Sequence, residues 1–337
     1  MSVFVPEGYR SILSVYDTQM AIGLLHRLFE DNLSAALSLY RVSAPLFVEE
    51  MTGLNDNLNG VERPVEFEIP VTGTKAQVVQ SLAKWKRMAL HRYGFFPGKG
   101  IYTDMNAIRR DEEILDNLHS VYVDQWDWEK VITEHERTLD YLKSTVIDIV
   151  KAVCDTQDTL QAIYPKLLQV PKISRTVSFV DTQTLEDLWP ELSPREREDR
   201  YVKEHPTAFL IGIGAPLRGG KPHDGRSPDY DDWRLNGDIL VWNELLGRSF
   251  ELSSMGIRVD AESLDRQLTA AGCDERRERL YHRMLLAGQL PQTIGGGIGQ
   301  SRLSMLLLGK AHIGEVQAGV WPEEDQRACE AKGIMLL

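Results

Sequence analysis

Gly295-Gly296-Gly297-Ile298-Gly299-Gln300-Ser301-Arg302-Leu303 is the stretch that says most about the fold of this chain. Four glycines in five positions lose much conformational freedom on folding, so a structural requirement is expected to keep them there. Glycines let a backbone or a flat ligand approach closely, and Arg302 falls in the first turn of a helix predicted over residues 300–308. A tight strand-to-helix turn is the alternative. A dinucleotide-binding fold fits poorly, because no βαβ unit follows the motif.

A second informative stretch is Val121-Tyr122-Val123-Asp124-Gln125-Trp126-Asp127-Trp128, within a strand predicted over residues 119–128. Residues two apart in a strand share a face, so Gln125 and Asp127 point together, while Asp124 and Trp126 point the other way. An amide and a carboxylate on one face suit a polar ligand. The alternative is a solvated sheet face with buried tryptophans on the reverse.

Arg109 lies at the end of a strand predicted over residues 98–109, just before the loop Arg110-Asp111-Glu112-Glu113. A guanidinium group matches the geometry of a phosphate or a carboxylate. Taken alone, however, this stretch is equally typical of a solvated turn with local ion pairs.

Two carboxylates are expected to meet across a hairpin of strands 237–242 and 249–254. Asp238 and Glu251 could hold Mg²⁺ or a ribose, because Mg²⁺ takes one or two carboxylates and completes its shell with waters and phosphates. The alternative is that Arg258 and Arg248 satisfy both carboxylates.

The remaining pattern predicts an α+β domain with a large antiparallel sheet, because strands cluster without regular βαβ alternation. The helices expected from apolar periodicity cover residues 11–37, 129–160, 261–273 and 275–287. A short helix capped by Ser81 carries Lys86, and a last strand is expected over residues 316–320. Asp56, in a loop after the first strand at residues 39–45, and Lys86 are more typical of surface charges when taken singly.

Composition limits the class of protein. The formal charge of −12 gives no support to a nucleic-acid partner, which needs a basic face. No apolar stretch is long enough to cross a membrane. The three cysteines, Cys154, Cys273 and Cys329, lack metal-type spacing and indicate a reduced, cytoplasmic setting.

The order of these signals resembles the three motifs of class II aminoacyl-tRNA synthetase catalytic domains. More specifically, long strings of the sequence resemble the aspartate–ammonia ligase family: Ser81 to Arg87, His119 to Glu129, Pro228 to Trp233, Leu235 to Asn243, Phe250 to Asp260 and Pro291 to Leu308. The resemblance extends from about Asp17 to Trp321 and is weakest over residues 154–199. It implies one catalytic domain over residues 1–337 with the class II fold, mainly antiparallel sheet flanked by helices, after a flexible arm at residues 1–10.

The resemblance implies ATP-dependent synthesis of asparagine from aspartate and ammonia through a β-aspartyl adenylate, with ATP and Mg²⁺ bound. Catalytic roles are then expected for Asp56, Lys86 and Arg109. Aspartate would be bound by Lys86, Arg109, Gln125, Asp127 and Ser254. ATP would be bound by Arg109, Asp231, Asp238, Glu251, Ser253, Arg258, Gly296 and Arg302, and the metal by Asp238 and Glu251. The family also implies a homodimer formed through the first helix and its strand.

Two other classes of protein compete with this interpretation. A true aminoacyl-tRNA synthetase would share the adenylate chemistry but should carry a basic anticodon-binding module, and no spare basic region is present. A catalytically silent binding protein on the same fold would be expected to have lost some of Arg109, Asp238, Glu251 and Arg302, and the chain keeps all four.

Overall fold

The computed structural model describes residues 3–56, 58 and 62–337 of the chain, and its framework is an eight-stranded sheet. In spatial order the strands are β1 (Leu39–Arg41), β5 (Gly100–Ile108), β6 (Tyr122–Val131), β11 (Thr293–Gly299), β10 (Arg248–Arg258), β9 (Asp231–Asn243), β8 (Thr207–Ile211) and β7 (Ser178–Asp181). The two edge pairs are parallel and the five inner pairs are antiparallel. The predicted mainly antiparallel α+β fold is confirmed.

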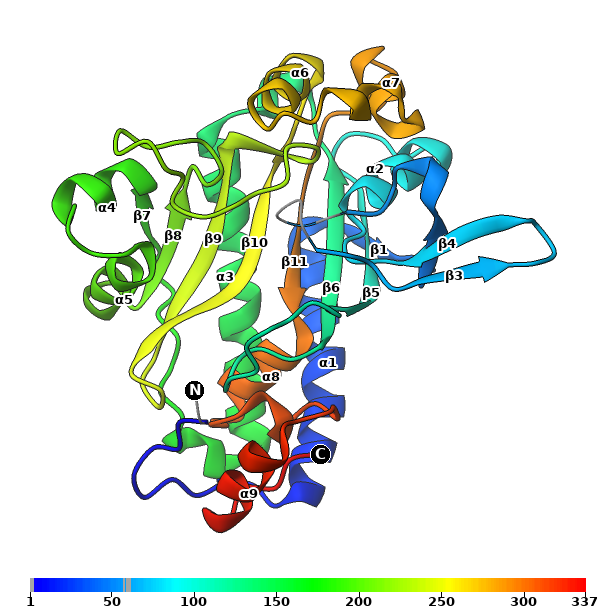
Figure 1. Ribbon diagram of the computed structural model, residues 1–337. Coiled ribbons are helices and arrows are strands. Elements are labelled where there is room, and N and C mark those ends of the chain that lie inside the picture. Colours follow the sequence, from blue (N-terminus) through cyan, green and yellow to red (C-terminus); the bar gives the residue numbers. More distant parts are fainter. Residues whose placement is uncertain (1–2, 57, 59–61) are drawn as a thin grey trace.

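Two long helices, α1 (Val15–Leu37) and α3 (Leu139–Ile163), lie against one face of this sheet (Figure 1). Trp126 and Trp128 of β6 are fully buried in the core between the sheet and these helices. The Trp126 ring packs 4.8 Å from that of Phe29, and its Nε1 donates to Glu30 at 3.1 Å. The opposite face of β6 is therefore left for Gln125 and Asp127, as the alternation of the strand predicts.

Shorter elements surround the framework. Helix α2 (Ala83–Arg92) packs on β6, and a small three-stranded sheet of β2 (Phe47–Glu49), β4 (Thr74–Val78) and β3 (Glu66–Ile69) projects from the body (Figure 1). Helices α4 (Thr182–Leu188) and α5 (Pro194–Glu204) lie beside β7, whereas α6 (Ala261–Ala270) and α7 (Leu280–Leu286) close the upper end in Figure 1. Helices α8 (Gln300–Leu307) and α9 (Glu323–Ala331) lie at the lower end.

Several predicted boundaries are wrong for identifiable reasons. The helix expected over residues 129–160 begins at Leu139, because residues 129–131 continue β6 between two partner strands. Ser14, rather than a residue near 11, caps α1, and its Oγ accepts from the Asp17 amide at 3.0 Å. At α2 the cap position is Leu82, and Ser81 Oγ instead accepts from the Ala83 amide at 3.2 Å.

The strand predicted over residues 316–320 is also wrong. The chain forms a short 3₁₀ turn, η5 (Ile313–Glu315), and then irregular structure up to α9. Val316 and Trp321 are buried in the core, whereas Val320 between them is 83% exposed. The apolar residues of this segment therefore pack singly, without a partner strand.

Residues 3–10 form neither helix nor strand, and they contact the body of the protein. The Phe4 amide donates to the Asn117 side chain at 3.0 Å, and the Asn117 amide donates back to Phe4 at 2.7 Å. Val3 and Tyr9 are buried against the C-terminal segment. Among the described residues, no helix combines the length and apolar character needed to cross a membrane.

Candidate active site

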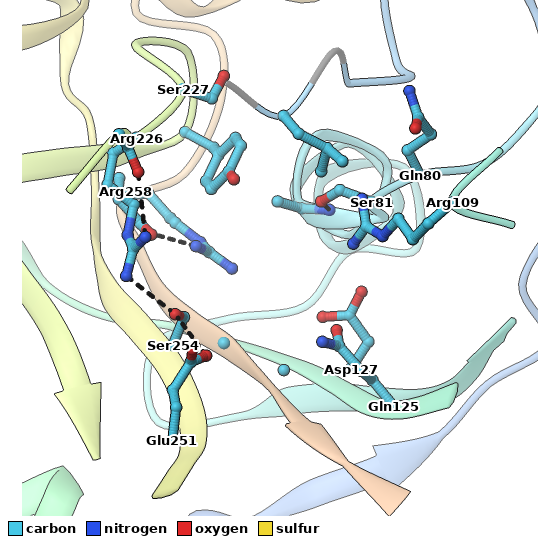
Figure 2. Close-up of a pocket in the computed structure, with 17 residues that line it drawn as sticks. Gln80, Ser81, Arg109, Gln125, Asp127, Arg226, Ser227, Glu251, Ser254 and Arg258 are labelled. Atoms are coloured by element: carbon cyan, nitrogen blue, oxygen red, sulfur yellow. Dashed lines mark hydrogen bonds and ion pairs between the residues drawn. The ribbon is translucent and has the colours of Figure 1, made fainter. Parts of the chain in front are cut away.

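The sheet face away from α1 and α3 carries a cavity of about 820 Å³ that is open to solvent. Eight of the residues singled out in the sequence line it: Arg109, Gln125, Asp127, Asp231, Glu251, Ser254, Arg258 and Gly296. Figure 2 shows Glu251, Ser254 and Arg258 on one side and Arg109, Gln125 and Asp127 on the other. A second cavity of about 750 Å³ shares Arg109, Gln125 and Glu251 with the first and is lined by Arg302. The structure thus brings most of the predicted site together.

The glycine strand β11 leaves room for two of these side chains. A Cβ at Gly295 would lie 2.6 Å from Arg258 Nη2, and a Cβ at Gly297 would overlap the Gln125 amide. Gly296 and Gly297 also line the first cavity. The close contacts that call for glycine on β11 are therefore contacts within the protein. Because its glycines have no Cβ atoms, β11 leaves space for side chains of the neighbouring strands.

Lys86 is fully buried beneath the cavity. Its Nζ donates to Asp127, to the Trp128 carbonyl at 2.9 Å and to the Gly296 carbonyl at 3.3 Å. Burial lowers the pKa of Lys86, and the Asp127 carboxylate opposes that shift. The surface-charge interpretation is wrong for this lysine, which is absent from the lining of both cavities and faces the first one through Asp127.

Arg258 is held rigidly at the side of the cavity. Its Nε and Nη2 donate to Glu129 at 3.2 and 3.1 Å, and its Nη1 donates to Asp231. Burial raises the pKa of Asp231, and the Arg258 guanidinium opposes that rise. Because both carboxylates are buried, this ion cluster fixes where Arg258 and Asp231 stand.

A β-bulge in β10 determines which of its side chains reach the cavity. The register against β9 shifts between Glu251 and Ser253. Glu251 and Ser254, three positions apart, consequently both line the cavity, which regular alternation would forbid. Ser253, predicted to bind ATP, is buried and lines neither cavity.

Asp238 and Glu251 lie close together, as the predicted hairpin requires. Ser254 Oγ stands between them, 2.6 Å from Asp238 Oδ1 and 3.3 Å from Glu251 Oε1. Burial raises the pKa of Asp238 to about 7; the Arg226 guanidinium opposes this rise and Glu251 adds to it. The expected alternative partners, Arg258 and Arg248, do not contact this pair in the described structure.

The donor set of this pair fits Mg²⁺. Two carboxylates beside an open cavity supply the few protein oxygens that Mg²⁺ needs when waters and phosphates complete its shell. Within residues 3–56, 58 and 62–337, no three His, Cys, Asp or Glu side chains gather into an all-protein metal site. The arrangement therefore suits a metal that arrives with a nucleotide better than a permanently caged one.

Two arginines that the sequence singled out line the cavities, Arg109 in both and Arg302 in the second. Arg109 is largely buried, and its Nη1 has no hydrogen-bond partner in the described structure. Arg302 Nη1 lies 3.5 Å from Glu251 Oε2 and donates to the Glu251 carbonyl at 3.1 Å. Helix α8, which carries Arg302, is capped from β6: Asp124 accepts from the Ser301 amide at 3.0 Å and from its hydroxyl at 2.6 Å.

Asp56 is buried rather than exposed. Ser227 Oγ lies 3.0 Å from Asp56 Oδ1 and 2.8 Å from Asp229 Oδ1, and Asp56 Oδ2 has no partner among the described residues. Burial raises the pKa of Asp56, and the Lys84 ammonium opposes the rise. Ser227 lines the first cavity, so Asp56 stands one hydrogen bond behind its wall.

Three polar residues near the site escaped sequence reasoning as candidates: Arg226, Ser227 and Asp229. Asp229 accepts from Arg276 at 2.7 Å, from His282 at 2.9 Å and from Lys84 at 3.4 Å. These partners lie about 50 to 145 positions away along the chain, so no local spacing could reveal them. The available signal was the polar run from 224 to 232, which is too rich in charges for an ordinary loop beside a core.

Solved structures with this architecture include aminoacyl-tRNA synthetases. Asparaginyl-tRNA synthetase from Pyrococcus horikoshii, complexed with asparaginyl-adenylate, matches with a TM-score of 0.64 at 14% identity, over 91% of this chain and 70% of that one. The Entamoeba histolytica enzyme matches with a TM-score of 0.62 at 14% identity, over 90% and 67%. The fold is that of the class II aminoacyl-tRNA synthetase catalytic domain, as predicted.

Sequence comparison defines the family within that fold class. The family model described as aspartate–ammonia ligase matches residues 16–333. The aspartate–ammonia ligase of Lactobacillus johnsonii is 55% identical over 339 residues and all of both chains, and that of Clostridium tetani is 55% identical over 336 residues, 99% of this chain and 98% of the relative. The chain belongs to the aspartate–ammonia ligase family, and it is an enzyme of ATP-dependent asparagine synthesis from aspartate and ammonia. Membership of this family excludes the two competing interpretations, a catalytically silent binding protein and a true aminoacyl-tRNA synthetase.

Proposed function

We propose that the reaction runs in two steps within the first cavity. The β-carboxylate of aspartate attacks the α-phosphorus of ATP, which forms β-aspartyl adenylate and releases pyrophosphate. Ammonia then attacks the β-carbonyl carbon and AMP leaves, which gives asparagine. The observation that carries this proposal is the cavity in which Arg109, whose buried Nη1 has no partner among the described residues, faces Gln125 and Asp127.

Activation of the carboxylate needs a better leaving group than an oxide, and AMP provides it. The protein's part in this step is positioning and charge neutralisation. Arg109 is the residue best placed for both, because its unpaired Nη1 can donate to a phosphate or carboxylate oxygen without first losing a partner. Arg302, in the adjoining cavity, is assigned to the adenine face or the outer phosphate.

Aspartate recognition is assigned to the floor of the cavity. Asp127 is placed for the α-ammonium group, Gln125 for a polar hydrogen bond, and Ser254 for a further contact. Lys86 holds Asp127 from below, so its proposed contribution is to fix and neutralise that carboxylate. Asp231 supports this side of the site by holding Arg258.

Asp238 and Glu251 are the residues that would hold Mg²⁺. When bound, the metal would offset charge on the phosphates of ATP. Ser254 keeps the two side chains at one place on the sheet, since its hydroxyl contacts both.

The second step requires ammonia rather than ammonium at the carbonyl carbon, so a base must take a proton. Asp56 is proposed for this role. Its burial raises its pKa, which makes the carboxylate a stronger base than an exposed aspartate, and Oδ2 accepts no hydrogen bond from the residues that the structure describes. The contact with Ser227 joins this carboxylate to the wall of the cavity.

The test is to follow pyrophosphate, AMP and asparagine from ATP, magnesium and aspartate, with and without ammonium. Equal amounts of AMP and asparagine with ammonium, and slow pyrophosphate release without it, would support the two-step route. Release of ADP and phosphate would show an acyl phosphate instead of an adenylate. Pyrophosphate without asparagine would place a different amine in the second step.

A homodimer is also proposed, because α1 leaves Tyr16 73% exposed and Met20 50% exposed on its outer side. Sedimentation equilibrium of the chain should give twice the 38.2 kDa of one copy, and the monomer mass at micromolar concentration would contradict this. A cytoplasmic location stays a prediction.

A further inference from the structure

Arg226 forms an ion pair with Asp238, one of the two carboxylates that are proposed to hold the metal. Its Nη2 donates to both oxygens of Asp238, at 2.6 Å for Oδ1. The same nitrogen lies 3.1 Å from Ser254 Oγ, a contact that Figure 2 shows. The Arg226 side chain is 14% exposed and Asp238 is 8% exposed, so this ion pair is shielded from water and salt. Arg226 therefore competes directly for the lone pairs that a cation would use.

The other end of the guanidinium is anchored within its own loop. Arg226 Nη1 donates to the Gly225 carbonyl at 3.1 Å and lies 3.3 Å from Asp224 Oδ2. The loop from 212 to 230 joins β8 to β9, and no helix or strand fixes Arg226 itself. A side-chain rotation can thus release Asp238 while the loop anchor remains.

Glu251 has a more exposed counter-ion than Asp238. Arg302 lies 3.5 Å from its carboxylate, the Glu251 side chain is 43% exposed, and both arginines lower its pKa. Each of the two carboxylates consequently has its own arginine: Asp238 has Arg226, and Glu251 has Arg302. Two negative charges close together would otherwise repel each other.

We propose that Arg226 is an exchangeable counter-ion of Asp238, which keeps divalent cations off the carboxylate pair until a nucleotide arrives. Asp238 would then be available to hold the metal that accompanies the nucleotide, and the released Arg226 guanidinium would pair with a phosphate of the nucleotide. The exchange is balanced in charge, since the phosphates bring the negative charge that Arg226 loses. This inference rests on the proposed metal role of Asp238 and Glu251.

The test measures Mn²⁺ binding to the full-length chain by electron paramagnetic resonance, without nucleotide and then with the non-cleavable α,β-methylene-ATP. The wild-type chain is expected to bind Mn²⁺ weakly alone and tightly with the nucleotide. Arg226→Gln should bind Mn²⁺ about tenfold more tightly without nucleotide, because Asp238 is then free. With nucleotide, the variant should lose that advantage and bind the analogue more weakly than wild type.

Matched variants separate this exchange from a general gain of negative charge. Arg109→Gln removes the same charge from the same cavity without touching Asp238, and Arg218→Gln removes an exposed arginine of the same loop that pairs with Asp187. Neither should tighten Mn²⁺ binding as Arg226→Gln does. Arg226→Lys, which keeps the charge but has no second nitrogen for the Gly225 carbonyl, should fall between wild type and Arg226→Gln, and it serves if the glutamine variant fails to fold.

Two results would overturn the inference: unchanged Mn²⁺ affinity in Arg226→Gln without nucleotide, or an equal gain in Arg109→Gln. Asp238→Asn and Glu251→Gln test the underlying metal site separately. Wild-type Mn²⁺ binding with nucleotide in both of these variants would remove the metal assignment itself, whatever Arg226 does.

Discussion

The side-chain amide of Gln125 lies in the space that a Cβ on Gly297 would fill, so these residues of neighbouring strands cannot both carry a side chain in their present positions. Gly297→Ala should displace Gln125 from the cavity floor. We expect kcat/KM for aspartate to fall roughly 10- to 100-fold, equivalent to about 1–3 kcal/mol, from the loss of one well-placed polar contact. Initial rates at varied aspartate concentration would measure this.

The control for that variant is Gly23→Ala in α1, where a Cβ would meet only Arg27 Nη1 at 3.7 Å. Alanine at such a helical position should raise stability by about 0.5–1 kcal/mol and leave the kinetics unchanged. Wild-type kcat/KM in Gly297→Ala would mean that Gln125 does not contact aspartate.

Arg109→Ala should abolish adenylate formation. The free buried nitrogen of Arg109 faces both cavities, and removal of a guanidinium aimed at transition-state charge costs about 10²–10³ in kcat. Pyrophosphate release under single-turnover conditions is the appropriate readout, and Arg110→Ala, the exposed neighbour, is the matched control. Pyrophosphate release at the wild-type rate would refute the assignment.

Asp56→Asn should separate the two steps. Asparagine keeps the contact with Ser227 but cannot take a proton, so pyrophosphate release should persist while asparagine formation slows by about 10²–10⁴. Raising the pH should partly restore asparagine formation, since more free ammonia is then present. Equal loss in both steps would indicate that Asp56 only holds the loop in place.

His312 should make the enzyme sensitive to acid. It is fully buried against Trp321, and burial lowers its pKa to about 4. The unfolded chain takes up a proton near pH 6.5 that the folded chain refuses until about pH 4, so stability is complete above 6.5 and is lost as the pH falls toward 4. Between pH 7.5 and 5 the lowered pKa of His312 should reduce the free energy of unfolding by roughly 2 kcal/mol.

Urea unfolding of wild type and His312→Asn at these two pH values would measure that reduction. The variant should be less stable at pH 7.5, because the contact with the Gly314 amide changes, but its stability should fall less on acidification. His91→Gln, at an exposed site in α2, should keep the wild-type pH slope. An identical slope in His312→Asn would exclude His312 as the acid-sensitive group.

The parts of the site that follow local rules were predictable. Gln125 and Asp127 share a face because side chains alternate in a strand, and Trp126 is buried on the reverse. Asp238 and Glu251 meet because the strands around them pair as a hairpin. The glycine strand was expected close to a ligand, but its stricter requirement is for the side chains of Gln125 and Arg258, which only the register of three strands brings together.

The parts that depend on distant contacts were not predictable. The stretch Glu129-Lys130-Val131 suits a helix as well as a strand, and pairing with β5 and β11 decides for the strand. Likewise, the local sequence around Lys86 is typical of a surface charge, whereas in the structure Asp127 and two backbone carbonyls, one from β6 and one from β11, surround its ammonium group. Arg226 escaped notice because its partner, Asp238, is twelve residues away on another element.

The bulge in β10 makes the number of residues in this strand, and not only their identity, necessary for placing the site side chains. Regular pairing of the same residues, without the bulge, would turn the residues on one side of Leu252 to the opposite face. Either Glu251 or the Ser254–Arg258 half would then exchange the cavity for the apolar core. Removing Leu252 itself would leave Glu251 and Ser254 two positions apart and on one face, whereas a one-residue deletion or insertion elsewhere in the strand would reverse the alternation beyond it. An enzyme library built on β10 should therefore vary residues at constant length.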